Sequence, residues 1–192
     1  KTTMLLRIPM VSELDRLVRS CDISLHSELE VLEILEKTCS GQGVKHRVIL
    51  MLDVGDLREG FFNENELIQT AIKIENGSGN LFLEGIGTNV GCYGSIKATP
   101  ENLGRLCFVA GNIERSIGRK LDIISGGGTS SLPLLGSDLM PLCINHLRIG
   151  EGFLTCRDLG RYFGFEISGT SKEAFIVEAE IIEVKVKPTH PI

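Results

Sequence analysis

The chain has 192 residues, of which 42% are hydrophobic and 23% charged, with 22 glycines and no tryptophan. This balance is typical of one folded globular domain and excludes a disordered, collagen-like or coiled-coil chain. The net charge of −5 gives no electrostatic footprint for a nucleic-acid backbone, and no apolar run reaches the roughly 20 residues that span a bilayer. Nucleic acid and membrane are therefore excluded as expected partners.

Short apolar runs alternate with segments of helical period along most of the chain. Strands are expected at residues 4–8, 23–25, 47–52, 81–86, 121–124 and 143–149. Helices are expected at about residues 12–19, 27–39, 64–75, 100–117 and 132–139. Repeated βαβ units favour parallel strands with right-handed crossovers. Two α/β architectures fit this pattern, an open doubly wound sheet and a (β/α)8 barrel of which six units form about three-quarters.

Start signals precede three of the expected helices. Ser12, Ser27 and Thr99 stand where a hydroxyl can accept a backbone N–H of the first turn. Pro100 follows Thr99 directly and suits the first helical position, because its fixed φ angle and missing N–H cost nothing there.

The character of the sequence changes near Gly169. Residues 175–187 alternate apolar and polar side chains over much of their length, which predicts a half-exposed antiparallel strand. We therefore expect a barrel domain over residues 1–168, and a linker with the first strand of a second, β-rich domain over residues 169–192. The opening without an initiator methionine and the end just after this run indicate an internal piece of a longer protein.

Cysteine and histidine spacing predicts no metal site. The cysteines are Cys21, Cys39, Cys92, Cys107, Cys143 and Cys156, and none forms a close pair with another cysteine or a histidine. Reduced thiols in a cytoplasmic protein are the expected state, most of them packed in the core. The histidines are His26, His46, His146 and His190, and they are expected in loops or at helix caps.

Polar and charged residues follow two of the most apolar strands. Four charges lie between Asp53 and Gly60, where Arg58 would reach an anionic or phenolic oxygen while Asp53 orients it. A salt-bridged loop that caps the next helix is an equally good interpretation of that run. After the following strand, Asn89 or Tyr93 would line a pocket, although a tight turn with a bulge accounts better for the four glycines there.

Two later strand ends carry the chemistry of a phosphate site. Residues 125–131 combine three consecutive glycines with hydroxyls, which favours a phosphate cradle over a flexible linker. Arg148 alternates with Leu147 and Ile149 and is therefore expected to point into a barrel lumen, where it needs a carboxylate or ligand partner. A buried structural ion pair is the alternative. Two such loops on consecutive strands match the phosphate site common late in barrels.

Together these runs resemble a known family. Residues 6–10, 25–29, 51–60, 87–89, 125–127 and 145–151 are similar to the pyridoxal-phosphate amino-acid racemases, in the ornithine-racemase branch of the alanine-racemase barrel superfamily. The resemblance covers essentially the whole chain, and the run Asp53-Val54-Gly55-Asp56-Leu57-Arg58-Glu59-Gly60 is its most specific motif. It implies a (β/α)8 TIM-type barrel, about strands 3–8 of which are present, leading into a second, β-rich domain.

The resemblance also implies a cofactor, pyridoxal 5′-phosphate, bound at the C-terminal face of the barrel. The implied cofactor-binding residues are Arg58, Asn89, Thr129, Ser130, Arg148, Gly150 and Glu151. Arg148 would face the pyridine nitrogen and keep it unprotonated, which suits racemisation better than transamination. Arg58 would approach the phenolic oxygen, and Asn89 stands where alanine racemases carry a histidine against the ring.

The remaining four residues, those of the two glycine-containing loops, would hold the phosphate. In this family the Schiff-base lysine lies on the first barrel strand, upstream of Lys1, and the second base is a tyrosine of a partner subunit, beyond Ile192. We therefore expect no catalytic residue and no metal in this chain, and a homodimer.

The implied function is racemisation of a free amino acid, ornithine or another basic one, by removal and return of the Cα proton on opposite faces. A non-catalytic pyridoxal-phosphate carrier is the first alternative; such proteins lack a second domain, so the strand expected at residues 175–187 favours the racemase. A barrel enzyme for another phosphorylated ligand is the second alternative.

Overall fold

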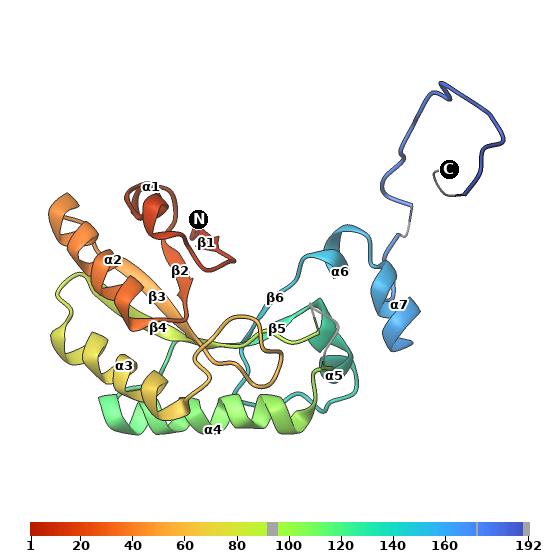
Figure 1. Cartoon of the computed structure of the whole chain (residues 1–192). Coiled ribbons are helices and arrows are strands. Elements are labelled where there is room, and N and C mark those ends of the chain that lie inside the picture. The colour runs from red at the N-terminus through yellow and green to blue at the C-terminus, as the bar shows by residue number, and fades with distance from the viewer. Residues whose placement is uncertain (92–95, 172, 190–192) are drawn as a thin grey trace.

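The computed structural model describes residues 1–91, 96–171 and 173–189, and its centre is one parallel sheet (Figure 1). The strands are β1 (Met4–Leu5), β2 (Ile23–His26), β3 (His46–Met51), β4 (Leu81–Gly87), β5 (Ile123–Gly128) and β6 (His146–Arg148). Their order in the sheet is β1-β2-β3-β4-β5-β6, so each strand pairs with its neighbour in sequence. A doubly wound sheet reverses its strand order, whereas a barrel does not. The strand order therefore excludes the doubly wound sheet and identifies part of a barrel.

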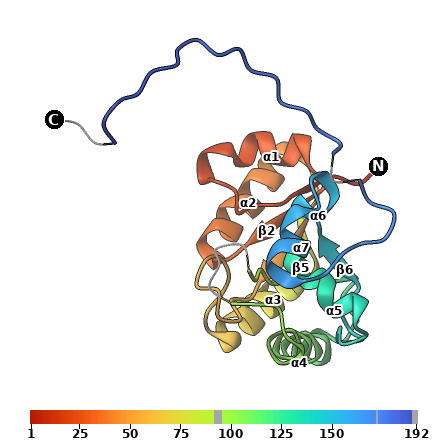
Figure 2. The same cartoon turned by 90° about the vertical axis from the view of Figure 1, so that its right-hand side faces the viewer.

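Helices cover one face of this curved sheet. They are α1 (Leu14–Ser20), α2 (Leu29–Gln42), α3 (Glu64–Gly77), α4 (Pro100–Ile117), α5 (Leu132–Gly136), α6 (Glu151–Leu154) and α7 (Arg157–Phe163), with 3₁₀ turns η1 (Val11–Glu13) and η2 (Thr129–Ser131). The long helices α2, α3 and α4 lie against the outer face of the sheet (Figure 1). The short helices α6 and α7 lie beside the β5–β6 end of the sheet (Figure 2). None of the helices in the described ranges is long and apolar enough to cross a membrane.

Strand β3 shows how the core is divided. Val48 and Leu50 pack outward with the helices in the larger apolar cluster, whereas Ile49 and Met51 pack inward with Leu25 of β2. All of them are fully buried. A strand buried on both faces is typical of the centre of a parallel sheet, and the continuous apolar run of β3 correctly predicts it.

Strand β5 differs from its predicted bounds. It runs through Gly128, so the glycine-rich segment expected as a loop is the second half of a strand. The glycines allow close approach of neighbouring backbone. A Cβ on Gly128 would lie 2.9 Å from the carbonyl oxygen of Arg148, and one on Gly126 would lie 2.7 Å from the side chain of Ile144. The glycines therefore serve strand packing, and the loop begins only at Thr129.

One of the three predicted helix starts is confirmed and two are wrong. Thr99 caps α4 as expected, because its side chain accepts the N–H of Asn102 at 3.2 Å and Pro100 opens the helix. Helix α2 instead has Glu28 as its N-cap, not Ser27, and Ser12 lies inside η1. Helices α6 and α7 have no counterpart among the predicted elements, because each is at most two turns long and carries little amphipathic pattern.

The last long segment that the structure describes is not a strand. Within the described residues 173–189 no helix or strand forms, and the segment runs away from the barrel (Figures 1 and 2). The alternating side chains are exposed, Ile182 by 95%. A strand needs a neighbour for its backbone N–H and C=O groups, and no described segment pairs with this one. The described residues 173–189 thus hold no strand in this structure, and the second, β-rich domain from residue 169 stays a prediction.

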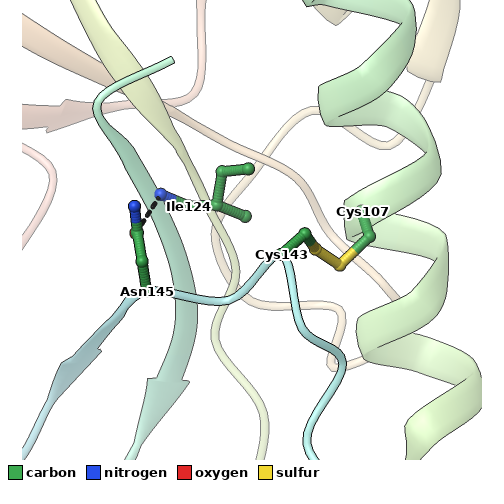
Figure 3. The surroundings of a disulfide bond; sticks show 4 residues. All are labelled: Cys107, Ile124, Cys143 and Asn145. Carbon is green, nitrogen blue, oxygen red and sulfur yellow. Dashed lines mark hydrogen bonds between the residues drawn. A yellow bond between two sulfur atoms is a disulfide. The ribbon is translucent and has the colours of Figure 1, made fainter. Parts of the chain in front are cut away.

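The cysteine prediction is wrong for one pair. Cys107 on α4 and Cys143 before β6 form a disulfide bond with a Cα–Cα distance of 6.0 Å (Figure 3), within the usual range. The two residues are 36 positions apart, and only the packing of α4 against the β5–β6 connection brings them together. Cys21, Cys39 and Cys156 are free, the last two buried as expected. Cys92 lies outside the described residues.

Candidate functional site

A cleft of about 400 Å³ lies at the carboxyl ends of the strands. It is lined by Leu6, Arg58, Asn89, Gly91, Gly128, Thr129, Ser130, Arg148, Gly150, Glu151, Asp158 and Phe163. All seven residues that the sequence proposes for cofactor binding are among them. They come from the loops after β3 and β4, from η2 after β5, and from the end of β6 with the start of α6. Parallel α/β proteins bind their ligands at this edge.

Arg148 crosses the inner face of the sheet. One Nη atom donates to Ser125 Oγ on β5, and Nη2 donates to the carbonyl oxygen of Thr88 at 2.7 Å and lies 3.5 Å from Asn89 Oδ1. The side chain is thus on the lumen side, as its alternation with Leu147 predicts. These three partners are neutral oxygens, and Arg148 is partly buried, so the expected partner of carboxylate or ligand type is not among them.

Gly87 at the end of β4 makes room for that arginine. A Cβ built on it would lie 3.1 Å from Ser125 Cβ, 3.2 Å from the Nη1 of Arg148 and 3.3 Å from Met51 Sδ. Any larger residue would therefore push on the guanidinium or on its neighbours.

The loop after β3 pairs its charges differently from the prediction. Arg58 donates from Nε and from Nη2 to the carboxylate of Glu59, the second bond measuring 2.8 Å. Asp53 was expected to orient Arg58, but its Oδ1 accepts the backbone N–H groups of Gly55 at 2.7 Å and Leu57 at 3.2 Å. Asp53 therefore shapes the loop, and Glu59 is the carboxylate that pairs with Arg58.

Glu59 also connects this loop to the next strand end. Its Oε1 accepts the Nδ2 hydrogen of Asn89 at 2.5 Å. Burial acts to raise the pKa of Glu59, but the hydrogen bonds from Arg58 and Asn89 outweigh it and hold the pKa below its ordinary value. An ionised carboxylate only accepts hydrogen bonds, so the amide nitrogen of Asn89 must face Glu59 and its oxygen must face Arg148.

The hydroxyls beside the glycine-rich strand are not equivalent. Thr129 Oγ1 accepts the backbone N–H of Gly152 at 3.0 Å, which leaves its own hydrogen able to point at a ligand. Ser130 Oγ already donates to the carbonyl oxygen of Val90 at 2.5 Å. An anion needs donors, so Thr129 is the better of the two candidates. Gly91, at φ +76°, lies so close that a Cβ there would be 2.8 Å from Ser130 Cβ.

Glu151 turns its side chain away from an anion-binding role. Its Oε1 accepts the Thr155 hydroxyl at 2.7 Å and the backbone N–H groups of Arg157 at 2.6 Å and Asp158 at 3.1 Å, which caps α7. Burial acts to raise the pKa of this carboxyl, and these hydrogen bonds lower it below the ordinary value. Glu151 can therefore bind an anion only through its backbone N–H, as Gly150 can. N–H groups in a first helical turn lack an intrahelical acceptor.

The three histidines that the structure describes lie on strands and not in loops, contrary to the prediction. His146 Nδ1 is 2.9 Å from Ser125 Oγ, and burial followed by the charge of Arg148 lowers the pKa of the imidazole. His26 and His46 share the hydroxyl of Ser24, at 2.7 and 2.8 Å, under the helices. His190 and the pocket candidate Tyr93 lie outside the described residues.

Sequence reasoning therefore missed three residues near the cleft. Glu59 stood inside the recognised motif without a role, and Ser125 was one of several hydroxyls of a glycine-rich run. Phe163 lies on a helix that was not predicted, and Lys97 Nζ is 5.8 Å from the centre of its ring. Apart from the pair of neighbours Arg58 and Glu59, these contacts join segments far apart in the chain, so no local pattern marks them.

The arrangement is suited to a flat anionic ligand. Two guanidinium groups, a hydroxyl and backbone N–H groups line the cleft together, around glycines whose missing side chains leave the backbone accessible. Among the described residues no group of three or more histidine, cysteine, aspartate or glutamate side chains is placed to hold a metal ion.

Comparison with known proteins adds relatives to this geometry. Residues 1–156 match the family model described as "Alanine racemase, N-terminal domain". The chain is 40% identical over 192 aligned positions to an ornithine racemase of Acetoanaerobium sticklandii, covering 98% of this chain and 53% of the relative. It is 38% identical over 189 positions to a lysine racemase of Thermotoga maritima, covering 98% and 51%. The chain thus spans about half the length of the curated relatives it matches.

Solved structures share the fold at low sequence identity. An alanine racemase of Clostridium difficile in complex with cycloserine superposes with a TM-score of 0.58 at 17% identity, covering 77% of this chain and 39% of that one. PipY of Synechococcus elongatus with PLP bound gives 0.61 at 15% identity, covering 78% and 68%. An unknown protein from Bifidobacterium adolescentis gives 0.66 at 16% identity, covering 79% and 60%.

Proposed function

Because this chain belongs to the alanine racemase N-terminal domain family, we propose that the full-length protein racemises a free amino acid with pyridoxal 5′-phosphate as its cofactor. The observation that carries the proposal is the single cleft in which guanidinium, hydroxyl and backbone N–H donors from four strand ends converge. The relatives called ornithine racemase and lysine racemase support a basic amino acid as the substrate.

The residues that line the cleft fit this cofactor. Arg148 carries only donors and stays protonated, so it would face the ring nitrogen without giving up a proton. Arg58 would stand at the phenolic oxygen. Thr129 and the N–H groups of Gly150 and Glu151 would hold the phosphate, with Ser130 keeping the β4 loop in place through Val90. When bound, pyridoxal phosphate supplies an electron-withdrawing ring that acidifies the Cα–H bond of an amino acid.

Arg148 is held in advance for this role. Its contacts to Ser125 and Thr88 fix the guanidinium on the inner face before any ligand arrives. His146 on the far side of Ser125 is neutral, since its pKa is lowered, and therefore adds no second positive charge there. A preorganised charge costs no rearrangement when the ligand binds.

The proposal leaves the proton-transfer pair outside this chain. Among the described residues that line the cleft there is no lysine and no tyrosine. The family resemblance supports a lysine on an earlier barrel strand and a tyrosine of a partner subunit, and hence a homodimer. Each would serve one face of the substrate carbon.

A cofactor-carrying protein without catalysis is the second candidate. PipY, whose solved structure has PLP bound, shares this fold at 15% identity and is covered over 68% of its length by this chain. Such a carrier would bind pyridoxal phosphate in the same cleft and convert no amino acid.

The test uses the full-length protein. Visible absorption is recorded, the protein is reduced with borohydride, and the labelled lysine is mapped, while chiral chromatography follows D- and L-ornithine and lysine. A band with label outside this chain, together with racemisation, supports the proposal. A band without turnover favours the carrier, label on Lys97 overturns the residue assignments, and the absence of any band overturns the cofactor proposal.

A further inference from the structure

Glu59 contacts Arg58 and Asn89 in the part of the cleft that the proposed function assigns to the cofactor ring, here called the ring end. It belongs to the loop after β3, between Arg58 and Gly60, and its side chain is only 15% exposed. It does not line the cleft, whereas both of its side-chain partners, Arg58 and Asn89, do. A charged group next to the lining acts on a ligand through the residues that it contacts.

The contacts of Glu59 tie two strand ends into one unit. Its two carboxylate oxygens accept both donors of the Arg58 fork, and Oε1 accepts Asn89 Nδ2 as well. A bidentate arginine–carboxylate pair is among the more rigid polar contacts in proteins. The loop after β3 and the loop after β4 are therefore joined at the edge of the cleft by this single carboxylate.

Glu59 also decides which way the amide of Asn89 points. With its nitrogen bound to Glu59, the amide turns its oxygen toward Nη2 of Arg148, 3.5 Å away. The reversed amide would place two hydrogen-bond donors against a guanidinium and an oxygen against a carboxylate, both unfavourable. The orientation is a consequence of the charge on Glu59.

We infer that Glu59 is a positioning residue that sets both the orientation of Asn89 and the charge balance at the ring end of the cleft. It compensates one of the two guanidinium groups, so that a ligand there meets Arg58, Asn89 and Arg148 with a net charge of about +1 instead of about +2. The inference rests on the proposed function, because it assigns this end of the cleft to the ring of the cofactor.

The charge balance predicts different responses to two substitutions. Glu59→Gln removes the negative charge and keeps a side chain of the same shape, so a proton on the bound ligand is disfavoured, and the pH midpoint of the bound cofactor's visible absorption should fall by about one unit. Asn89→Asp brings a second carboxylate oxygen against Glu59 Oε1, which Asn89 Nδ2 now contacts at 2.5 Å, so the two carboxylates share one proton and the midpoint should stay unchanged.

The double variant E59Q/N89D exchanges the carboxylate and the amide without changing the total charge. Its midpoint is expected to return to within about 0.3 units of the unsubstituted protein, because Arg58 and Arg148 again face one carboxylate and one amide. Glu64→Gln is the matched control. Glu64 pairs with Arg105 in a similar arginine–glutamate contact on the helices, away from the cleft, and this change should leave the midpoint where it was.

The experiment is a spectroscopic pH titration of the full-length protein loaded with pyridoxal 5′-phosphate, with thermal melting measured alongside. A carboxylate that merely holds the loop would lower the melting temperature without moving the midpoint, and an unmoved midpoint in E59Q would overturn the inference. A double variant that keeps the shift of E59Q would overturn it as well. Failure of the unsubstituted protein to take up the cofactor would instead overturn the proposed function, and this inference with it.

Discussion

Nη2 of Arg148 donates to the carbonyl oxygen of Thr88 at 2.7 Å, so that a side chain of the edge strand β6 reaches across β5 to the end of β4. The contact links three strands at the point where ligands bind. Strand β6 has only three residues, and its register with β5 shifts between Ser125 and Gly128. The arginine therefore stabilises the edge of the sheet and prepares the cleft at the same time.

Replacing Arg148 by lysine tests its role in the cleft. Arg148→Lys keeps the charge but loses the planar fork that contacts Ser125 and Thr88 together. We expect affinity for pyridoxal 5′-phosphate to fall by about tenfold or more in the full-length protein, as for loss of a charge-assisted hydrogen bond. Absorbance titration measures it. Arg115→Lys on the exposed face of α4 is the control, and equal losses in both variants would contradict the role of Arg148.

Gly87→Ala tests the space that the arginine needs. The new methyl group would stand 3.2 Å from Nη1 of Arg148 and 3.1 Å from Ser125 Cβ. A loss of about 1–3 kcal/mol in the free energy of unfolding is expected from this overpacking, together with weaker cofactor binding. Denaturant unfolding of the full-length protein measures the first quantity.

Gly104 provides the opposite expectation for the same substitution. It lies inside α4, and a Cβ there meets nothing within 4 Å. Gly104→Ala should stabilise the protein by about 0.5–1 kcal/mol, because alanine loses less backbone entropy in a helix. If both variants changed the free energy of unfolding in the same direction, the packing argument at Gly87 would be wrong.

Local sequence signals predict most of the fold. The apolar run of β3 and the Thr99–Pro100 helix start are predictable from the sequence, because their structure depends on neighbours in sequence. The ordered strand ends then bring Arg58 and Arg148, which are 90 positions apart, into one cleft, and the family motif anticipates this. What sequence could not provide is pairing between distant side chains: Asn89 with Glu59, and Cys107 with Cys143. Such pairs follow from the packing of loops and helices, which no periodicity encodes.

The buried histidines predict a loss of stability in mild acid. Burial, with the charge of the neighbouring His46, lowers the pKa of His26 to about 3; burial, with the charge of Arg47, lowers that of His46 to about 4. Their pKa values in the unfolded chain are near 6.5, so the unfolded state binds more protons below that pH. The stabilisation is present above pH ~6.5 and is lost as pH falls toward the folded values, by about 2 kcal/mol per histidine at pH ~5.

Denaturant unfolding of the full-length protein at pH 7, 6 and 5 checks this expectation. His46→Gln keeps a hydrogen-bonding side chain opposite Ser24 but cannot titrate, so it should flatten the pH dependence by roughly half. The measurement stops at pH 5 because carboxylates with lowered pKa values, such as that of Glu33, begin to contribute below it. A free energy of unfolding that does not change between pH 7 and 5 would contradict the buried, neutral state of the two rings.

Reducing the Cys107–Cys143 disulfide should loosen the start of β6. Two residues after Cys143, Asn145 accepts the N–H of Ile124 at 2.8 Å and donates to the carbonyl oxygen of Asp122 at 2.9 Å, so the disulfide bond anchors the segment that aligns β6 with β5 (Figure 3).

A cross-link that closes 36 positions is worth about 3–4 kcal/mol in the free energy of unfolding. Cys107→Ser should cost that amount under non-reducing conditions and become indistinguishable from the unsubstituted protein in dithiothreitol. Cys21→Ser, at a free and partly exposed thiol, should change neither value. Thiol counting before and after denaturation provides the independent check, since two thiols must appear only on reduction. If dithiothreitol left the free energy of unfolding unchanged, the two cysteines would not be bonded in solution.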